Sequence, residues 1–164
     1  MDRSSVEKLI RSSRDRSRSL HNLSSCTRSP ILRLQADEIN HRNEKFLDQI
    51  GGAASEVDRS VLLPSRSRYS LLITDAEGIV IESYAPEGME AEFQRNGLVR
   101  GSVWDERVAG TNGISMSMQT GRVLTVLGDE HFYTCFHGFS CSSAPLMDAE
   151  NNLIGTITLV GSVR

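Results

Sequence analysis

Residues 103–148 read VWDERVAGTNGISMSMQTGRVLTVLGDEHFYTCFHGFSCSSAPLMD and concentrate several chemically distinctive side chains. The single tryptophan of the chain, two of its four histidines and two of its three cysteines lie in this window. Glycines and small hydroxyl residues make up much of the remainder. A plain hydrophobic core does not need this composition, so the window predicts either a binding pocket or a catalytic site.

The composition of the whole chain is that of one globular domain. Its 164 residues are 38% hydrophobic and 24% charged, which is enough for a single core. No apolar run approaches the roughly 20 residues of a membrane helix, and the N-terminus lacks the apolar core of a signal peptide, so we expect no membrane partner. Three cysteines without the spacing of a disulfide scaffold indicate a reduced, cytoplasmic setting.

Charge divides the chain into two parts. Residues 1–34 hold eight Lys/Arg against three Asp/Glu, a balance of +5, and the other 130 residues have a balance of −8. Because affinity for nucleic acid comes from clustered positive charge, the acidic body is not expected to bind DNA itself. The Ser/Arg-rich stretch 1–29 is interpreted as a basic leader that is solvated and caps or docks on the acidic body.

A helix is predicted over residues 31–50, after Pro30 at its start and before Gly51-Gly52 at its end. The seam positions follow steps of four and three, typical of one helix face: Leu32, Ala36, Ile39, Asn43, Phe46 and Ile50. This seam either packs on the sheet of its own domain or pairs with a second copy, and the central Asn43 favours the homodimer. A second short helix is expected at 54–63, so residues 30–63 form an N-terminal helical segment.

Strand patterns dominate residues 64–164. An apolar strand at 70–74, a turn at 75–78 and a return strand at 79–83 predict a hairpin. A similar hairpin is expected from residues 144–147 and 153–160, and another strand from 124–127. Residues 88–96 and 113–119 look helical. These elements predict an α+β fold, an antiparallel sheet covered by helices with an N-terminal helical segment.

Four motifs inside the body resemble a known family. They are Trp104-Asp105-Glu106, Gly110-Thr111-Asn112-Gly113-Ile114, Gly128-Asp129-Glu130-His131-Phe132, and the stretch Cys141-Ser142-Ser143-Ala144-Pro145-Leu146-Met147-Asp148. Their order and spacing resemble the GAF-type N-terminal sensor domain of bacterial transcription activators of the acetoin-catabolism and dihydroxyacetone-operon kind. Ser13-Arg14-Asp15-Arg16-Ser17 in the leader is similar to that family's N-terminal motif, with Arg14 where the family carries tryptophan.

The resemblance implies a non-enzymatic sensor module without a cofactor. It would bind a small catabolic effector and act on DNA and RNA polymerase only through an output module. The sequence has no Walker-type loop and no helix-turn-helix pattern, so we expect the output module outside this chain, as a sigma-N ATPase activator or an AraC-like DNA-binding domain. The expected ligand-binding residues are Trp104, Glu106, Thr111, Asn112, Glu130, His131, Phe132, Cys141 and Ser142.

The individual residues leave alternatives open. Thr111 or Asn112 can cap a helix that starts near Ile114 instead of binding a ligand. Trp104 can fill the core instead of lining a pocket. His131, Cys135, His137 and Cys141 offer a second function as a metal or redox sensor, although their spacing is unlike that of tight zinc sites. A thiol enzyme with Cys141 and His131 is the third hypothesis.

Overall fold

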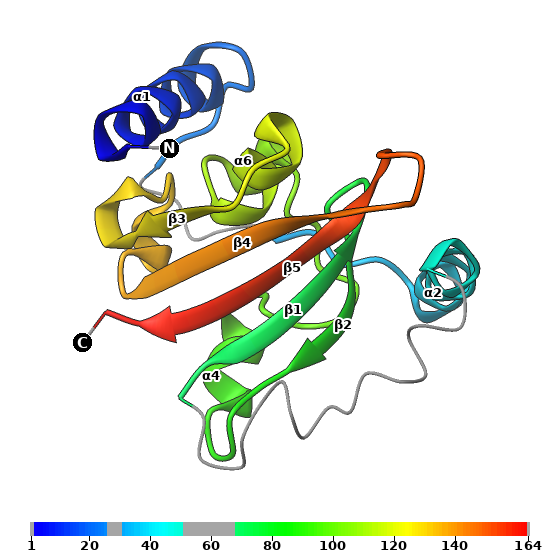
Figure 1. Ribbon diagram of the computed structural model, residues 1–164. Coiled ribbons are helices and arrows are strands. Elements are labelled where there is room, and N and C mark those ends of the chain that lie inside the picture. Colours follow the sequence, from blue (N-terminus) through cyan, green and yellow to red (C-terminus); the bar gives the residue numbers. More distant parts are fainter. Residues whose placement is uncertain (1, 26–30, 51–67, 164) are drawn as a thin grey trace.

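A five-stranded antiparallel sheet forms the body of the protein in the computed structural model, which describes residues 2–25, 31–50 and 68–163 (Figure 1). The strand order is β2-β1-β5-β4-β3. The strands are β1 (Ser70–Asp75), β2 (Val80–Tyr84), β3 (Leu124–Leu127), β4 (Phe139–Met147) and β5 (Leu153–Ser162). The helices are α1 (Arg3–Ser19), α2 (Ala36–Ile50), α4 (Glu90–Arg95), α5 (Glu106–Ala109) and α6 (Gly113–Thr120). The predicted α+β fold is confirmed.

Both predicted hairpins turn on an aspartate that accepts backbone hydrogen bonds. Asp75 Oδ1 accepts from the amides of Glu77 and Ile79. Asp148 Oδ1 likewise accepts from the amides of Glu150 and Asn152. These local bonds replace part of the strand ladder and favour a tight reversal. The second hairpin is longer than predicted, because β4 begins at Phe139.

The main core lies between one face of the sheet and the segments that cover it. Helix α6 packs against β3, β4 and β5, and the buried cluster around it is mostly aromatic and aliphatic. This cluster contains Leu72, Val80, Phe93, Leu98, Trp104, Ala109, Ile114, Phe132, Tyr133, Phe136, Phe139, Cys141 and Val160. Two one-turn 3-10 helices, η2 (Gly128–Glu130) and η3 (Thr134–Phe136), carry the chain from β3 to β4 and close this core.

The basic leader is more structured than predicted. Residues 3–19 of it form the 17-residue helix α1, whose N-cap is Asp2. Ile10 of α1 packs with Met116, Leu124 and Val126 of the body. Figure 1 shows α1 above β3 and α6, and α1 contacts α5 and α6. Residues 3–19 of the leader therefore dock on the body, as predicted, and they do so as a helix.

Helix α2 begins five residues later than predicted. Residues 32–34 run alongside residues 101–103: the Val103 amide donates to the Leu32 carbonyl and the Leu34 amide donates to the Gly101 carbonyl. These extended bonds are incompatible with a helix at the same residues, so Leu32 leaves the predicted seam and is 57% exposed. Pro30 and the helix predicted at 54–63 lie outside the described residues.

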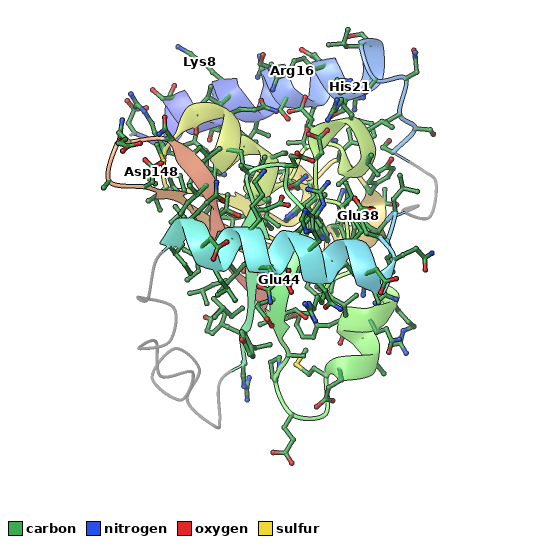
Figure 2. All side chains as sticks on the ribbon, turned by 90° about the vertical axis from the view of Figure 1, so that its right-hand side faces the viewer. Lys8, Arg16, His21, Glu38, Glu44 and Asp148 are labelled. Carbon is green, nitrogen blue, oxygen red and sulfur yellow. The ribbon has the colours of Figure 1, made fainter. Side chains whose placement is uncertain are left out.

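The seam of α2 packs on its own domain. Phe46 forms a cluster with Ile81 and Ile154, on the face of the sheet opposite to the main core. Ile39 is buried and lies against Gly101. Figure 2 shows α2 in front of the sheet, with Glu38 and Glu44 on it. The interpretation of the seam as self-packing is thus the one that the geometry supports. In the described parts of the chain, no helix is long and apolar enough to cross a membrane.

Candidate functional site

Glu106 is the centre of a buried polar cluster between α1 and the body. It is the first residue of α5 and only 2% exposed. Arg16 approaches it with two nitrogens: Nε donates to Oε1 and Nη2 to Oε2, both at 2.9 Å. The Ser13 hydroxyl donates to Oε2 at 2.9 Å and Gln119 Nε2 donates to the same oxygen at 2.8 Å. A carboxylate with this many charge-assisted and neutral donors is well stabilised in spite of its burial.

The pKa of Glu106 reflects these opposing influences. Burial raises the pKa of this carboxyl, but hydrogen bonds from Arg16, Gln119 and Ser13, together with the Arg16 charge, more than offset it. The net pKa of Glu106 therefore lies below its ordinary value. His21, just after α1, adds a nearby ring nitrogen, with Nε2 3.6 Å from Glu106 Oε1. Figure 2 shows Arg16 and His21 at the α1 side of the molecule.

Thr111 and Asn112, neighbours in sequence, have different roles. Thr111 Oγ1 lies 2.9 Å from Ser13 Oγ and 3.4 Å from Ser17 Oγ, so it extends the Glu106 cluster. Asn112 is the N-cap of α6: its Oδ1 accepts from the Ser115 amide, and its Nδ2 donates to the carbonyls of Trp104 and Gly110. All polar atoms of the Asn112 side chain are thus engaged, and this geometry favours the capping interpretation.

Trp104 is part of the main core. Its indole Nε1 donates to the Gly97 carbonyl at 3.1 Å, and its ring lies 5.0 Å from that of Phe136. The space beside it is a void of about 10 Å³ between the sheet and α6. Its lining is Leu72, Leu98, Trp104, Asn112, Gly113, Ile114, Cys141, Thr158 and Val160. A void of this size holds at most about one water molecule.

His131 is completely buried where η2 ends. Its Nδ1 lies 3.0 Å from the Gly128 carbonyl oxygen, and its ring is 6.3 Å from that of Phe136. Burial is the main reason why the pKa of His131 falls to about 4. The ring is therefore neutral at pH 7. A carbonyl only accepts hydrogen bonds, so Nδ1 carries the proton and Nε2 is an acceptor. Among the described residues, Nε2 of His131 has no hydrogen-bond partner.

Glu130 and Phe132, the two sequence neighbours of His131, lie in different environments. Glu130 Oε2 accepts from the Leu127 amide at 2.8 Å, and its other oxygen pairs with Arg3 of α1. Phe132 is fully buried and lies against Gly110, where an added β-carbon would come within 2.5 Å of the Phe132 side chain. Glu130 therefore belongs to the α1 interface and Phe132 to the core.

The cysteine motif divides between the two faces of the sheet. Cys141 is buried in the main core, and burial raises the pKa of its thiol to about 12. A thiol with this pKa is almost entirely protonated at pH 7 and is a poor nucleophile. Ser142 is exposed on the opposite face, where its Oγ lies 2.9 Å from Thr125 Oγ1. Within residues 2–25, 31–50 and 68–163, no three His, Cys, Asp or Glu side chains are placed to hold a metal ion.

The nine predicted site residues therefore do not line one pocket. Glu106 and Thr111 meet under α1, and Glu130 contacts Arg3 of the same helix. Trp104, Asn112 and Cys141 border the small void, Phe132 lies in the core, and His131 is buried at the end of η2. Ser142 is separate from all of these. The polar cluster also contains residues that the prediction did not include: Ser13, Arg16, Ser17, His21 and Gln119. The signal for three of them was the leader motif at residues 13–17, whose serines and Arg16 face the body.

The fold and these buried motifs define a GAF-like regulatory domain with a docked N-terminal helix. A crystal structure of the E. coli DhaR(N)-DhaL complex has the same fold, with a TM-score of 0.79 and 23% sequence identity. The match covers 94% of this chain and 53% of that chain. Over residues 3–164 the chain matches the family of the MimR N-terminal domain, and it belongs to that family.

Two curated relatives show the kind of protein in which this domain occurs. The acetoin catabolism regulatory protein of Cupriavidus necator is 34% identical over 85 residues, 52% of this chain and 13% of that protein. The propane 2-monooxygenase operon transcriptional activator MimR of Mycolicibacterium smegmatis is 32% identical over 100 residues, 58% of this chain and 17% of that protein. The chain thus spans less than a fifth of either relative. These matches confirm the predicted family and its regulatory, non-enzymatic character.

Proposed function

We propose that this chain senses a small hydroxyl-bearing catabolic compound and signals to a DNA-binding output module in the same regulator. The family supports this, because the similar proteins named above are a regulatory protein of acetoin catabolism and a transcriptional activator of a propane 2-monooxygenase operon. The observation that carries the proposal is the buried, neutral imidazole of His131. Its Nε2 is an acceptor without a partner among the described residues.

The unpaired Nε2 indicates what the effector must carry. A buried acceptor without a hydrogen bond costs free energy, and a ligand that supplies a donor recovers that cost. Alcohols and hydroxyketones supply such a donor. Ketones without a hydroxyl group do not, and carboxylates bring a charge into an aromatic environment that cannot stabilise it. Phe136, whose ring lies 6.3 Å from that of His131, and Trp104, whose ring lies 5.0 Å from that of Phe136, would contact the carbon skeleton.

Effector binding requires the packed interior to open. The void of about 10 Å³ beside Trp104 is too small for a four-carbon compound, and His131 does not line it. The segment from η2 to η3 is the wall that would have to move, because it carries His131 and Phe136 between β3 and β4. Its displacement would change the start of β4, and β4 pairs with the last strand, β5, along its whole length. A signal can thus reach the end of the domain through the sheet.

Matched compounds test this proposal in a thermal-shift assay. Acetoin and 2,3-butanedione differ only in the reduction of one carbonyl to a hydroxyl group, and so do 2-propanol and acetone. We expect a rise in Tm with the hydroxyl member of a pair and none with its ketone, because ligands that bind the native state stabilise it. His131→Asn should remove the shift. Ser142→Ala, on the opposite face, should keep it. Equal shifts with both members of each pair would contradict the donor requirement.

A protein partner is the second candidate for the signal. The tight packing around Trp104 favours it, since the void there must enlarge before a small compound can enter. The structurally similar DhaR(N) was crystallised as a complex with DhaL. If none of the compounds shifts Tm, calorimetric titration with the host's protein of DhaL type becomes the decisive experiment, and binding there would replace the small-molecule effector.

We also propose that the regulator is cytoplasmic and acts as a homodimer. A cytoplasmic location follows from its proposed action on DNA. The dimer would not use the seam of α2, because Ile39 and Phe46 are already buried in their own domain. Sedimentation velocity tests this proposal, and a single species at the monomer mass across micromolar concentrations would reject it.

A further inference from the structure

The hydrogen bonds between α1 and the body around Glu106 have their acceptor on one side and most of their donors on the other. The acceptor, Glu106, belongs to the body, whereas nearly all its partners belong to α1 or directly follow it. Gln119 is the single donor from another element within the described residues. Without α1, Glu106 would be a carboxylate with one neutral donor, in a pocket shaped by Thr111 and Gln119.

The geometry around Arg16 is specific for a guanidinium group. Two of its nitrogens contact the two oxygens of one carboxylate, and Nη2 also donates to Gln119 Oε1 at 2.7 Å. A planar fork of donors matches this arrangement, but the ammonium of lysine is a point charge that cannot contact all three oxygens in this way. The pocket therefore selects for shape as well as for charge.

The other contacts that hold α1 on the body are weak enough to break and re-form. Its buried apolar contact is Ile10 with a small cluster, and Arg14 and Arg3 pair at the surface with the η2 segment. A helix of this length and polarity is marginal in isolation, so α1 owes its order to the body. Release of α1 would expose the Glu106 pocket and leave its charge unpaired, which favours any cation that fits.

We propose that Glu106 and Gln119 form a guanidinium-binding site on the body, that Arg16 is its resident ligand, and that a guanidinium group from another molecule can replace it and free α1. The incoming group could be a small guanidinium compound or an arginine of a protein segment, including α1 of a second copy. The site uses Glu106 and Gln119 and not the His131 side chain, so it does not rest on the effector proposed above.

Chemical rescue tests the site directly. In Arg16→Ala, we expect Tm to fall by roughly 5–10 °C, because a buried carboxylate loses its main partner. The amides of residues 3–19 should also exchange faster in deuterium-exchange mass spectrometry. Millimolar methylguanidinium should restore a large part of the lost Tm in a saturable manner. It should do the same with less effect in Arg16→Lys, whose ammonium occupies the site in part.

Two controls separate binding from a general effect of the cation. Arg11→Ala removes an exposed arginine of the same helix, so its Tm should match the wild type and should not respond to methylguanidinium. Arg16→Ala combined with Glu106→Gln lacks the charge that holds the cation, so rescue should disappear. Absence of saturable rescue in Arg16→Ala, or equal rescue in either control, would overturn the proposal.

A peptide of residues 1–23 distinguishes the two sources of the guanidinium group. If the site prefers an arginine on a protein segment, this peptide should restore the Tm of Arg16→Ala at a concentration at least tenfold lower than that needed with methylguanidinium. The same peptide with Arg16 replaced by alanine should not. Rescue by methylguanidinium with no advantage for the peptide identifies the site as one for small compounds. Rescue by both peptides alike would overturn guanidinium recognition.

Discussion

The buried imidazole of His131 makes the stability of the domain depend on pH in a window that few other groups affect. In the folded protein its pKa is about 4, whereas in the unfolded chain it has its ordinary value of 6.5. Between these values the unfolded chain binds the proton and the folded protein does not. Stability is therefore complete above about pH 6.5, falls as the pH drops towards 4, and falls no further through this group below that.

The size of the effect follows from the two pKa values. Each pKa unit corresponds to about 1.4 kcal/mol, so the change from 6.5 to about 4 costs roughly 3.5 kcal/mol of the free energy of unfolding. Glu106 acts in a different window. Its folded pKa lies below its ordinary value of 4.5, so its contribution is present above pH 4.5 and is lost only at lower pH. The two residues can thus be separated by pH alone.

Urea unfolding at pH 7.5, 6.5, 5.5 and 4.5 measures this dependence. The matched variant is His131→Asn, because the asparagine side chain cannot titrate and its amide can still donate to the Gly128 carbonyl. We expect the wild type to lose most of this roughly 3.5 kcal/mol relative to the variant between pH 6.5 and 4.5. Parallel curves for the two proteins would refute the assignment of a buried, neutral imidazole.

Three further perturbations test the fold. Trp104→Ala should cost roughly 3–5 kcal/mol in urea unfolding, since the indole fills the core, whereas a role in ligand binding alone would leave stability nearly unchanged. Gly155→Ala should disrupt the pairing of β1 and β5 and lower Tm strongly, because the new β-carbon would lie 1.9 Å from the Thr74 carbonyl oxygen. The control Gly138→Ala, at a position with open space around it, should leave Tm unchanged. Ile39→Asp should destabilise the monomer, and a stable variant that merely dissociates in sedimentation would restore the dimer seam.

The positions of the strands and of the turns between them could be predicted from the sequence, because local signals specify them. Asp75 and Asp148 accept backbone hydrogen bonds from residues at most four positions away, so the residues of each turn alone specify it. The same holds for the Asn112 cap of α6. The start of α2 could not be predicted in this way, since residues 32–34 are held extended by residues 101–103, which lie far away in the sequence.

The functional residues were harder to group than the strands. Glu106 was singled out from its motif, but its partners Ser13 and Arg16 lie in a distant stretch that composition alone marks as a solvated leader. Only tertiary contact turns that stretch into part of a site. Conversely, Ser142 and Cys141 are adjacent in sequence and face opposite sides of the sheet, because side chains alternate along a strand. The concentration of motifs in residues 103–148 therefore indicated where the functional residues lie, but not which of them contact one another.

The central proposal, an effector that donates a hydrogen bond to neutral His131, has one direct measurement. In ¹⁵N NMR spectra of the histidine side chains, titration with acetoin should move the Nε2 resonance of His131 upfield, towards the position of a hydrogen-bonded acceptor, and leave Nδ1 protonated. 2,3-Butanedione at the same concentrations should not move it. An Nε2 resonance that already has the position of a bonded acceptor and does not respond to acetoin would contradict the proposal.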